Sequence, residues 1–258
     1  MSAIDRSNWT FEQLIEEADT VSVAGWDFSW LDGRASEGRP SWGYSRLIAE
    51  RLHRSQAALD IQTGGGEVLA GAAPLPPLTV AVEGWPPNWR IAQQTLAPLG
   101  AHVVAAGDDG PVLPLRGETF DLVICRHPVR TWWTEIARVL KPGGTYLSQE
   151  IGPGQAKAVT EWFMGPQPAS DTRTPERHRR LAEQAGLDVV DLRLESLPMA
   201  FNDIGAVVYF LRKVIWTVPD FSVERYRDRL LALHQWIQDN GAFRAQSVRF
   251  LIEARKPE

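Results

Sequence analysis

Cysteine is almost missing from this 258-residue chain, which has a single one at Cys125. One thiol excludes an intrachain disulfide and any zinc site built from several cysteines. The five histidines show none of the spacings that hold a metal ion, so we expect no metal centre. Low cysteine content is typical of a reducing compartment, and we expect a cytoplasmic protein.

The chain also lacks a long apolar run and an excess of basic residues. Its longest apolar stretch, 204–211, is followed at once by Arg212 and Lys213 and is too short to span a bilayer. Residues 1–6 contain no apolar segment of the kind found in secretory signals. The net charge of -5 argues against a strongly basic groove for duplex nucleic acid. We therefore expect neither a membrane nor a nucleic acid as a partner, and the sequence indicates no oligomeric state.

From residue 57 onward, short apolar segments alternate with segments of helical periodicity. Strands are predicted at 57–61, 78–82, 102–106, 120–125, 145–150, 187–197 and 243–254. Helices are predicted at 43–53, 67–73, 87–99, 131–140, 175–185, 204–215 and 226–237. This alternation implies a parallel sheet covered by helices on both faces, which is a doubly wound α/β fold.

The remaining segments are assigned to a cap and two insertions. Residues 1–42 combine one helical stretch with an irregular part rich in Gly, Ser and Trp, and 43–258 form the main domain. Within it, 152–174 is interrupted by prolines and shows little periodicity, so we predict a long connection that covers a site. The segment 198–242 carries two amphipathic helices. Both insertions are predicted to be lids on the side of the sheet where a substrate would bind.

The most informative segment is a glycine-rich turn after the first predicted strand. Residues 58–67 read Ala-Leu-Asp-Ile-Gln-Thr-Gly-Gly-Gly-Glu. Glycine leaves room for a ligand to approach the backbone, and amides at the start of the following helix point outward. A dinucleotide motif starting at Gly64 would need a third glycine where the chain has Leu69, and no Gly-Lys-Ser/Thr of a P-loop follows. The turn is typical of a ligand without a pyrophosphate.

Over residues 43–150 the chain resembles the class I methyltransferases that use S-adenosylmethionine (SAM), and among them the methyltransferase type 11-like group. The turn is similar to the family motif D-x-G-x-G-x-G, and the ranges 120–127 and 137–144 are similar to the family's fourth strand and the turn before its fifth. The resemblance implies SAM as cofactor and S-adenosylhomocysteine (SAH) as product. It also implies a Rossmann-like, mostly parallel seven-stranded sheet with an antiparallel final strand.

The resemblance further implies a set of cofactor-binding residues. The turn would hold the methionine end of SAM. An acid at the end of the second strand would hold the ribose, and an acid after the third strand would lie near the adenine amino group. A carboxylate suits two adjacent hydroxyls because it accepts two hydrogen bonds. The set comprises Asp60, Gln62, Thr63, Gly64, Gly66, Glu83, Gly84, Trp85, Asp108, Asp109 and Arg126, with Asp108 preferred over Asp109 for the adenine.

The first glycine of the family motif is replaced by Gln62 in this chain. Its side chain is either tolerated, or it crowds the tail of the cofactor, or its amide hydrogen-bonds the cofactor's carboxylate. Crowding would weaken or alter cofactor binding.

Two polar residues at the end of the fourth predicted strand are candidates for catalysis, because ligands of open α/β sheets bind outside the carboxyl ends of the strands. We predict that His127 deprotonates or orients the acceptor while Arg126 holds an anionic group. In the alternative interpretation both are ordinary polar residues at a strand end. Trp132, Trp133 and Trp162 are candidates for an apolar wall, although at least one of the first two should face the core.

Three functions remain open from the sequence. The acidic charge balance and the absence of a separate RNA-binding domain favour methyl transfer to an oxygen or nitrogen atom of a small molecule. The second function is an RNA or protein methyltransferase, although Arg126-His-Pro-Val129 differs from the Asn-Pro-Pro-aromatic run of many members that methylate amide or exocyclic nitrogens. The third is a protein that binds SAM or SAH without methyl transfer, which the departure at Gln62 keeps open.

Overall fold

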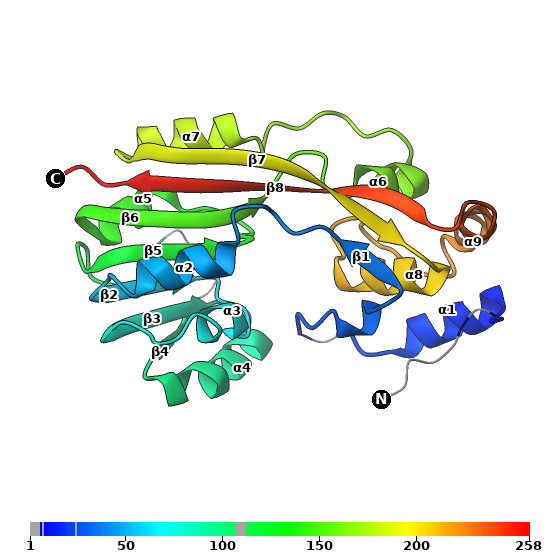
Figure 1. Ribbon diagram of the computed structural model, residues 1–258, viewed down its shortest axis with the longest axis horizontal. Coiled ribbons are helices and arrows are strands. Elements are labelled where there is room, and N and C mark those ends of the chain that lie inside the picture. The colour runs from blue at the N-terminus through cyan, green and yellow to red at the C-terminus, as the bar shows by residue number, and fades with distance from the viewer. Residues whose placement is uncertain (1–5, 7, 24, 107–111) are drawn as a thin grey trace. The chain divides into compact units, whose positions relative to one another are not determined.

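The computed structural model describes residues 6, 8–23, 25–106 and 112–258, in which helices and strands alternate (Figure 1). The strands are β1 (Ala35–Glu37), β2 (Ala57–Ile61), β3 (Leu78–Glu83), β4 (His102–Ala105), β5 (Phe120–Arg126), β6 (Leu140–Ile151), β7 (Asp188–Phe201) and β8 (Phe243–Arg255). The α-helices are α1 (Phe11–Thr20), α2 (Tyr44–Leu52), α3 (Glu67–Ala70), α4 (Pro86–Leu96), α5 (Trp133–Val139), α6 (Lys157–Met164), α7 (Pro175–Gln184), α8 (Ile204–Lys213) and α9 (Arg227–Asn240). Two short 3-10 helices are η1 (Ser29–Leu31) and η2 (Ala97–Leu99).

The strands hydrogen-bond in the order β1-β7-β8-β6-β5-β2-β3-β4. Neighbours from β6 to β4 pair in parallel, and β8 pairs antiparallel with β6. The predicted doubly wound, mostly parallel sheet with an antiparallel final strand is therefore confirmed. It has eight strands instead of seven, because β1 comes from the segment that was expected to be irregular and pairs antiparallel with the end of β7.

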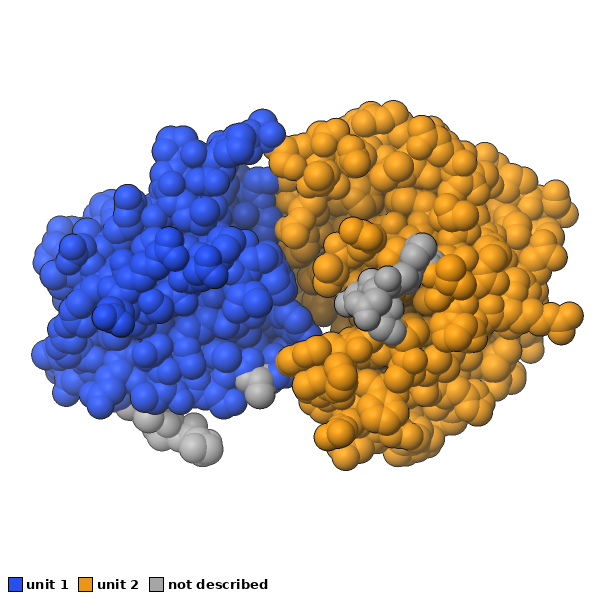
Figure 2. Space-filling view, turned by 180° about the vertical axis from the view of Figure 1, so that it is seen from behind, with its two compact units in different colours: residues 1–38, 154–169, 196–247 blue, residues 39–153, 170–195, 248–258 orange. Residues whose placement is uncertain are grey.

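The chain divides into two compact units, which Figure 2 colours separately. Unit 1 comprises residues 1–38, 154–169 and 196–247, and unit 2 comprises 39–153, 170–195 and 248–258. The strands β7 and β8 contribute residues to both units. The glycine-rich turn and both predicted catalytic residues belong to unit 2.

In unit 2, successive side chains of each strand point to opposite faces of the sheet, as strand geometry requires. Leu59 and Val123 pack in a buried cluster with side chains of α5 and α7. Ala58 and Leu122, one residue earlier in each strand, pack in a second cluster with side chains of α2, α3 and α4. Helices thus cover both faces of the sheet, as predicted.

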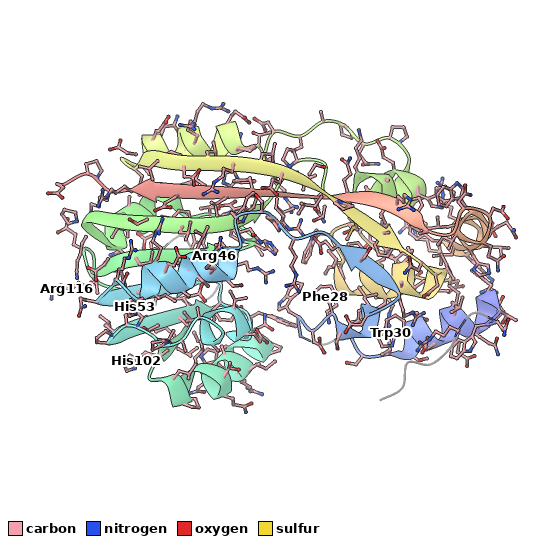
Figure 3. All side chains as sticks on the ribbon, in the orientation of Figure 1. Phe28, Trp30, Arg46, His53, His102 and Arg116 are labelled. Carbon is pink, nitrogen blue, oxygen red and sulfur yellow. The ribbon has the colours of Figure 1, made fainter. Side chains whose placement is uncertain are left out.

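Unit 1 is built around a helical core. Buried side chains of α1, α6, α8 and α9 form one apolar cluster. Arg34 is 5% exposed and joins the segment before β1 to two helices of this unit. Its guanidinium donates to Asp203 at 2.7 and 2.9 Å and to Glu17 at 2.9 Å, and it lies 3.8 Å from the ring centroid of Trp30, labelled in Figure 3. Three separate segments are linked by this one side chain.

The structure corrects the predictions in two segments. The range 152–174, expected to lack periodicity, contains α6, whose Val159 and Phe163 are fully buried one helical turn apart. The turn before the strand predicted at 145–150 was expected within 137–144, yet β6 begins at Leu140 and includes residues 141–144. Of the helices in the described residues, none combines the length and apolar character needed to cross a membrane.

Candidate functional site

The glycine-rich turn lies at the carboxyl end of β2, which sits between β3 and β5 in the sheet. Three of its residues have a left-handed backbone, namely Gln62 at φ 57°, Gly64 at φ 65° and Gly66 at φ 82°. Glycine adopts this conformation readily, whereas a residue with a side chain pays about 1–2 kcal/mol. The conformation therefore explains the glycines, and Gln62 needs a compensating interaction.

Gly66 is required for space as well as for conformation. A Cβ atom there would lie 2.7 Å from Cγ of Leu96 on α4. Leu96 is fully buried beside Leu69 of α3 in the same cluster. The turn is thus packed closely against α4. The helix that follows the turn, α3, has only four residues and is shorter than predicted.

The carboxylate of Glu83 connects the end of β3 to this turn. Glu83 is 8% exposed, and its Oε2 accepts the backbone N–H of Gly64 at 2.7 Å. Its Oε1 accepts the backbone N–H of Trp85 at 2.9 Å. The acid predicted to bind a ribose is held in place at the predicted position.

Asp60 is the second buried acid of the turn. It is 7% exposed, and its Oδ2 accepts a hydrogen bond from the Thr63 hydroxyl at 2.6 Å. Burial raises the pKa of Asp60 to about 7, the Thr63 hydroxyl opposes this rise, and the negative charge of Glu83 adds to it. A positively charged ligand group beside Asp60 would favour its ionised form. The site is therefore electrostatically suited to a cationic ligand.

The side chain of Gln62 compensates for its left-handed backbone. Its Nε2 donates to the carbonyl oxygen of Arg130 at 2.8 Å, and its Oε1 accepts the backbone N–H of Val129 at 2.7 Å. These bonds hold the loop that follows β5 against the turn. Both amide atoms that were expected to face a cofactor are bonded to the chain itself. Contact between Gln62 and the cofactor stays a prediction.

Replacing Gln62 by glycine, the residue of the family motif, should release this loop without unfolding the chain. Glycine relieves the left-handed backbone, which offsets part of the roughly 0.5–1.5 kcal/mol lost with each hydrogen bond. We expect the Val129 amide to exchange with deuterium about tenfold faster in Gln62→Gly, while the amides of β2 keep their protection. Gln62→Asn is the matched variant. Asparagine tolerates the left-handed backbone, but its side chain is one methylene too short for the bonds to Val129 and Arg130, so we expect faster exchange here too. Unchanged exchange of the Val129 amide in both variants would contradict the idea that the Gln62 side chain holds the loop after β5 against the turn.

The two predicted catalytic residues lie at and just beyond the end of β5. Arg126 is the last residue of the strand and is exposed. The backbone N–H of His127 donates to the carbonyl oxygen of Gln149 at 2.7 Å, and its ring Nε2 lies 3.1 Å from Nε2 of Gln149. Burial lowers the pKa of His127 well below its usual value, and the charges of Arg126 and Arg249 lower it further. His127 is therefore neutral at physiological pH.

The other residues predicted to bind the cofactor differ in their surroundings. Gly84 follows Glu83 directly, and the side chain of Trp85 is 53% exposed. Asp108 and Asp109 lie outside the described residues. The structure thus brings together the turn, Glu83 and the residues after β3 at one edge of the sheet.

The predicted tryptophan wall is not assembled from the first two candidates. Trp132 and Trp133 are 8% and 6% exposed, and both belong to the core cluster beneath α5. Trp132 is the N-cap of α5 and Trp133 is its first residue, and both face the core. Trp162 belongs to unit 1, where its indole N–H donates to the carbonyl oxygen of Arg229 at 3.1 Å.

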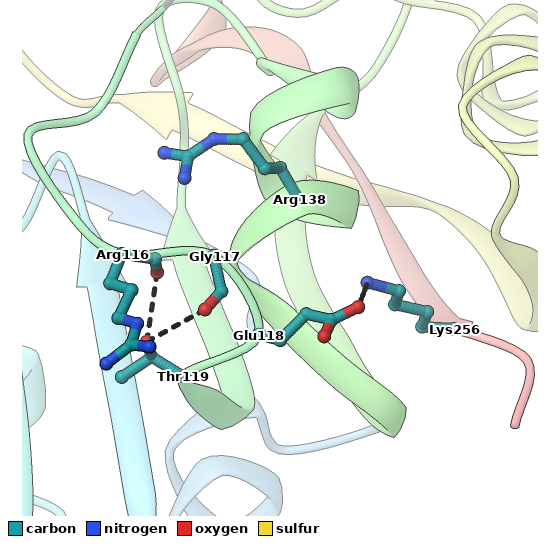
Figure 4. A pocket seen from close by; sticks show the side chains of 6 residues that line it. All are labelled: Arg116, Gly117, Glu118, Thr119, Arg138 and Lys256. Carbon is teal, nitrogen blue, oxygen red and sulfur yellow. Dashed lines mark hydrogen bonds and ion pairs between the residues drawn. The ribbon is translucent and has the colours of Figure 1, made fainter.

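An open hollow at the start of β5 is lined by Arg116, Gly117, Glu118, Thr119, Arg138 and Lys256 (Figure 4). Its charges are partly satisfied, since Lys256 lies 3.4 Å from Glu118 and Arg138 lies 2.7 Å from Glu135. Because β5 runs parallel to β2, the start of β5 lies at the sheet edge opposite to the turn. The hollow is separate from the candidate cofactor site.

The histidines are spread over different elements. His53 follows α2 and His102 begins β4, as labelled in Figure 3. Within the described part of the chain, no group of three or more His, Cys, Asp or Glu is arranged to hold a metal ion.

Comparisons with known proteins find one family model and several solved structures that are similar to this chain. Residues 59–148 match the family model described as a methyltransferase domain. The solved BH2331 protein of Bacillus halodurans is 20% identical with a TM-score of 0.58, covering 84% of this chain and 99% of that chain. Phosphoethanolamine N-methyltransferase 2 of Haemonchus contortus was solved with phosphomonomethylethanolamine and SAH. It is 17% identical with a TM-score of 0.55, covering 96% of this chain and 61% of that chain. The [4+2]-cyclase SpnF is 18% identical with a TM-score of 0.51, covering 86% of this chain and 84% of that chain. Among curated proteins, no sequence matches this chain.

The matched range contains the turn, Glu83 and His127, which are the residues that the structure gathers at the carboxyl ends of β2, β3 and β5. The similarity to solved structures shows the shared fold, and the family match covers the part of the chain that contains the turn. Residues 59–148 match the model of a methyltransferase domain, and the chain shares the fold of the solved structures similar to it.

Proposed function

We propose that this chain transfers a methyl group from SAM to an oxygen or nitrogen atom of a small-molecule acceptor. The main support is the buried carboxylate of Glu83, bonded to the turn through Gly64 at 2.7 Å. A carboxylate at this place suits the two adjacent hydroxyls of a ribose. The raised pKa of Asp60, about 7, supports a cationic ligand such as the methionine end of SAM.

The residues of the site have separate tasks in this proposal. SAM supplies a methyl group that is already activated on a sulfonium sulfur, so alignment with the acceptor provides much of the rate. Glu83 orients the ribose, and Asp60 with the glycines of the turn holds the methionine end. Asp108 or Asp109 serves the adenine. Arg126 and His127 face the acceptor side at the end of β5.

A small molecule is the preferred acceptor for two reasons. The net charge of -5 offers no excess of basic residues for binding RNA. The Haemonchus contortus enzyme was solved with a small phosphorylated amine, so this fold accommodates such acceptors. SpnF has the same fold and is named as a [4+2]-cyclase, so the fold alone does not imply methyl transfer. A function without methyl transfer is therefore the second candidate.

Transfer of radioactive methyl from labelled SAM tests the proposal. The purified chain is incubated with a protein-free metabolite extract, with total RNA and with a protein extract, at a SAM concentration too low to saturate Glu83→Gln, which serves as the reference of low activity. We expect label in the metabolite fraction with the wild-type chain alone. Label in RNA or protein would contradict the small-molecule acceptor. Binding of SAM without label in any fraction would favour the second candidate.

A further inference from the structure

A chain of three hydrogen-bonded side chains in unit 2 ends at His127. The indole Nε1 of Trp42 donates to Oε1 of Gln149 at 2.9 Å, and Nε2 of Gln149 lies 3.1 Å from Nε2 of His127. Trp42 and Gln149 are 3% and 4% exposed. The sequence contains no signal for these hydrogen bonds, because Trp42 and Gln149 are 107 residues apart.

The chemistry of the donors fixes the direction of both hydrogen bonds. An indole N–H only donates, so the amide oxygen of Gln149 faces Trp42. The amide nitrogen of Gln149, which also only donates, then faces His127. A ring nitrogen that accepts a hydrogen bond carries no proton, so the proton of the neutral imidazole lies on Nδ1.

The surroundings of His127 oppose its protonation. The charged groups that act on the ring are both cationic, namely Arg126 on β5 and Arg249 on β8. Burial adds to their effect and lowers the pKa of His127 well below its usual value. Gln149 also accepts the backbone N–H of His127 at 2.7 Å, so one residue fixes both the main chain and the ring. The left-handed backbone of His127, φ 56°, is held by the same contact.

We propose that Trp42 and Gln149 are positioning residues that hold His127 as the neutral tautomer with its proton on Nδ1. His127 then meets the acceptor as a hydrogen-bond donor and not as a general base, a role that rests on the proposed methyltransferase function. An N–H donor favours an acceptor that presents a lone pair or a negative charge, such as a carboxylate, a phenolate or a neutral amine. No proton passes to His127. The proton of an amine acceptor leaves to water after the new N–C bond has formed.

NMR correlation of ring protons with ring nitrogens reads the tautomer directly in the 15N-labelled chain, because protonated and unprotonated ring nitrogens resonate far apart. Comparison with His127→Gln assigns the signals. We expect a proton on Nδ1, none on Nε2, and no titration of the ring between about pH 8 and about pH 5.5.

The variant Gln149→Glu reverses the polarity of the link to His127. The carboxylate still accepts from Trp42, but it now offers an acceptor to the ring. We expect the proton to move to Nε2 and the pKa of His127 to rise by about 1–3 units. Gln94→Glu, at an exposed position of α4, adds the same charge and should leave the tautomer unchanged.

A wild-type ring with its proton on Nε2, or one that titrates near its ordinary pKa of about 6.5, would overturn the proposal. This result is decisive even where Gln149→Glu does not fold, because it comes from the wild-type chain. The spectra need neither cofactor nor acceptor. Failure of the tautomer proposal is therefore distinguishable from failure of methyl transfer, which the labelling experiment measures.

Discussion

Replacing Asp60 by asparagine is expected to stabilise the ligand-free chain, and to do so more at pH 8 than at pH 5. Burial raises the pKa of Asp60 to about 7, whereas an unfolded aspartate has a pKa of about 3.9. The folded state thus binds the proton more tightly, and the ionised carboxylate costs stability as the pH rises from about 4 to about 7. Asparagine carries no charge, so the stability gain should grow by about 2–3 kcal/mol between pH 5 and pH 8.

Urea unfolding of wild type and Asp60→Asn at both pH values measures this difference. The control is Asp121→Asn, which should destabilise the chain by about the same amount at both pH values. Burial opposes the shift at Asp121, but hydrogen bonds from Lys141 and from two backbone amides lower its pKa. Its ionised form therefore stabilises the fold. Both its folded and its unfolded pKa lie below pH 5, so this contribution is already complete there, and Asp121→Asn should lose the same stability at pH 5 and at pH 8. A stability difference between wild type and Asp60→Asn that is the same at both pH values would contradict the raised pKa of the buried Asp60 carboxyl.

Glu83→Gln is expected to weaken the binding of both SAM and 5′-methylthioadenosine by about 10–100-fold. Glutamine keeps the size of the side chain but replaces one oxygen by an N–H donor. That donor would face the backbone N–H of either Gly64 or Trp85, which now bond to the carboxylate at 2.7 and 2.9 Å. The charge-assisted bonds that we propose between Glu83 and the ribose hydroxyls would be lost as well. Isothermal titration calorimetry measures both affinities.

Two controls separate the ribose from the methionine end. Glu176→Gln removes an exposed charge from α7 and should leave both affinities unchanged. Asp60→Asn should weaken SAM but spare 5′-methylthioadenosine, which has the ribose and lacks the cationic methionine end. A loss of 5′-methylthioadenosine affinity in Asp60→Asn as large as its loss of SAM affinity would refute the separate tasks of these acids.

The sheet and the position of the acids were predictable because they follow from local rules. Short apolar strands alternate with helices, and the carboxyl ends of neighbouring parallel strands share one edge of the sheet. This places Asp60 near Glu83 without any knowledge of the tertiary structure. Two elements escaped prediction for physical reasons. The strand β1 has only three residues and depends on its pairing with β7, and α6 is enclosed by prolines that hide its short apolar stripe.

The chemistry of individual side chains was less predictable, because it depends on partners that are distant in sequence. Gln62 bonds to the backbone of Arg130, 68 residues away, so its compensating role has no sequence signal. His127 meets the general requirements of a base near neutral pH. Its burial, its two cationic neighbours and its bond to Gln149 emerge only from the folded chain.

Calorimetric titration of SAM into the wild-type chain at about pH 8 and about pH 6 tests the central claim most directly. We expect one SAM bound per chain, competition by SAH, and weaker binding at the lower pH. The pH effect arises because Asp60, with a pKa of about 7, then has to lose a proton before it can pair with the cationic ligand. The absence of SAM binding and of competition by SAH at both pH values would contradict the assignment of Asp60 and Glu83 to a SAM site.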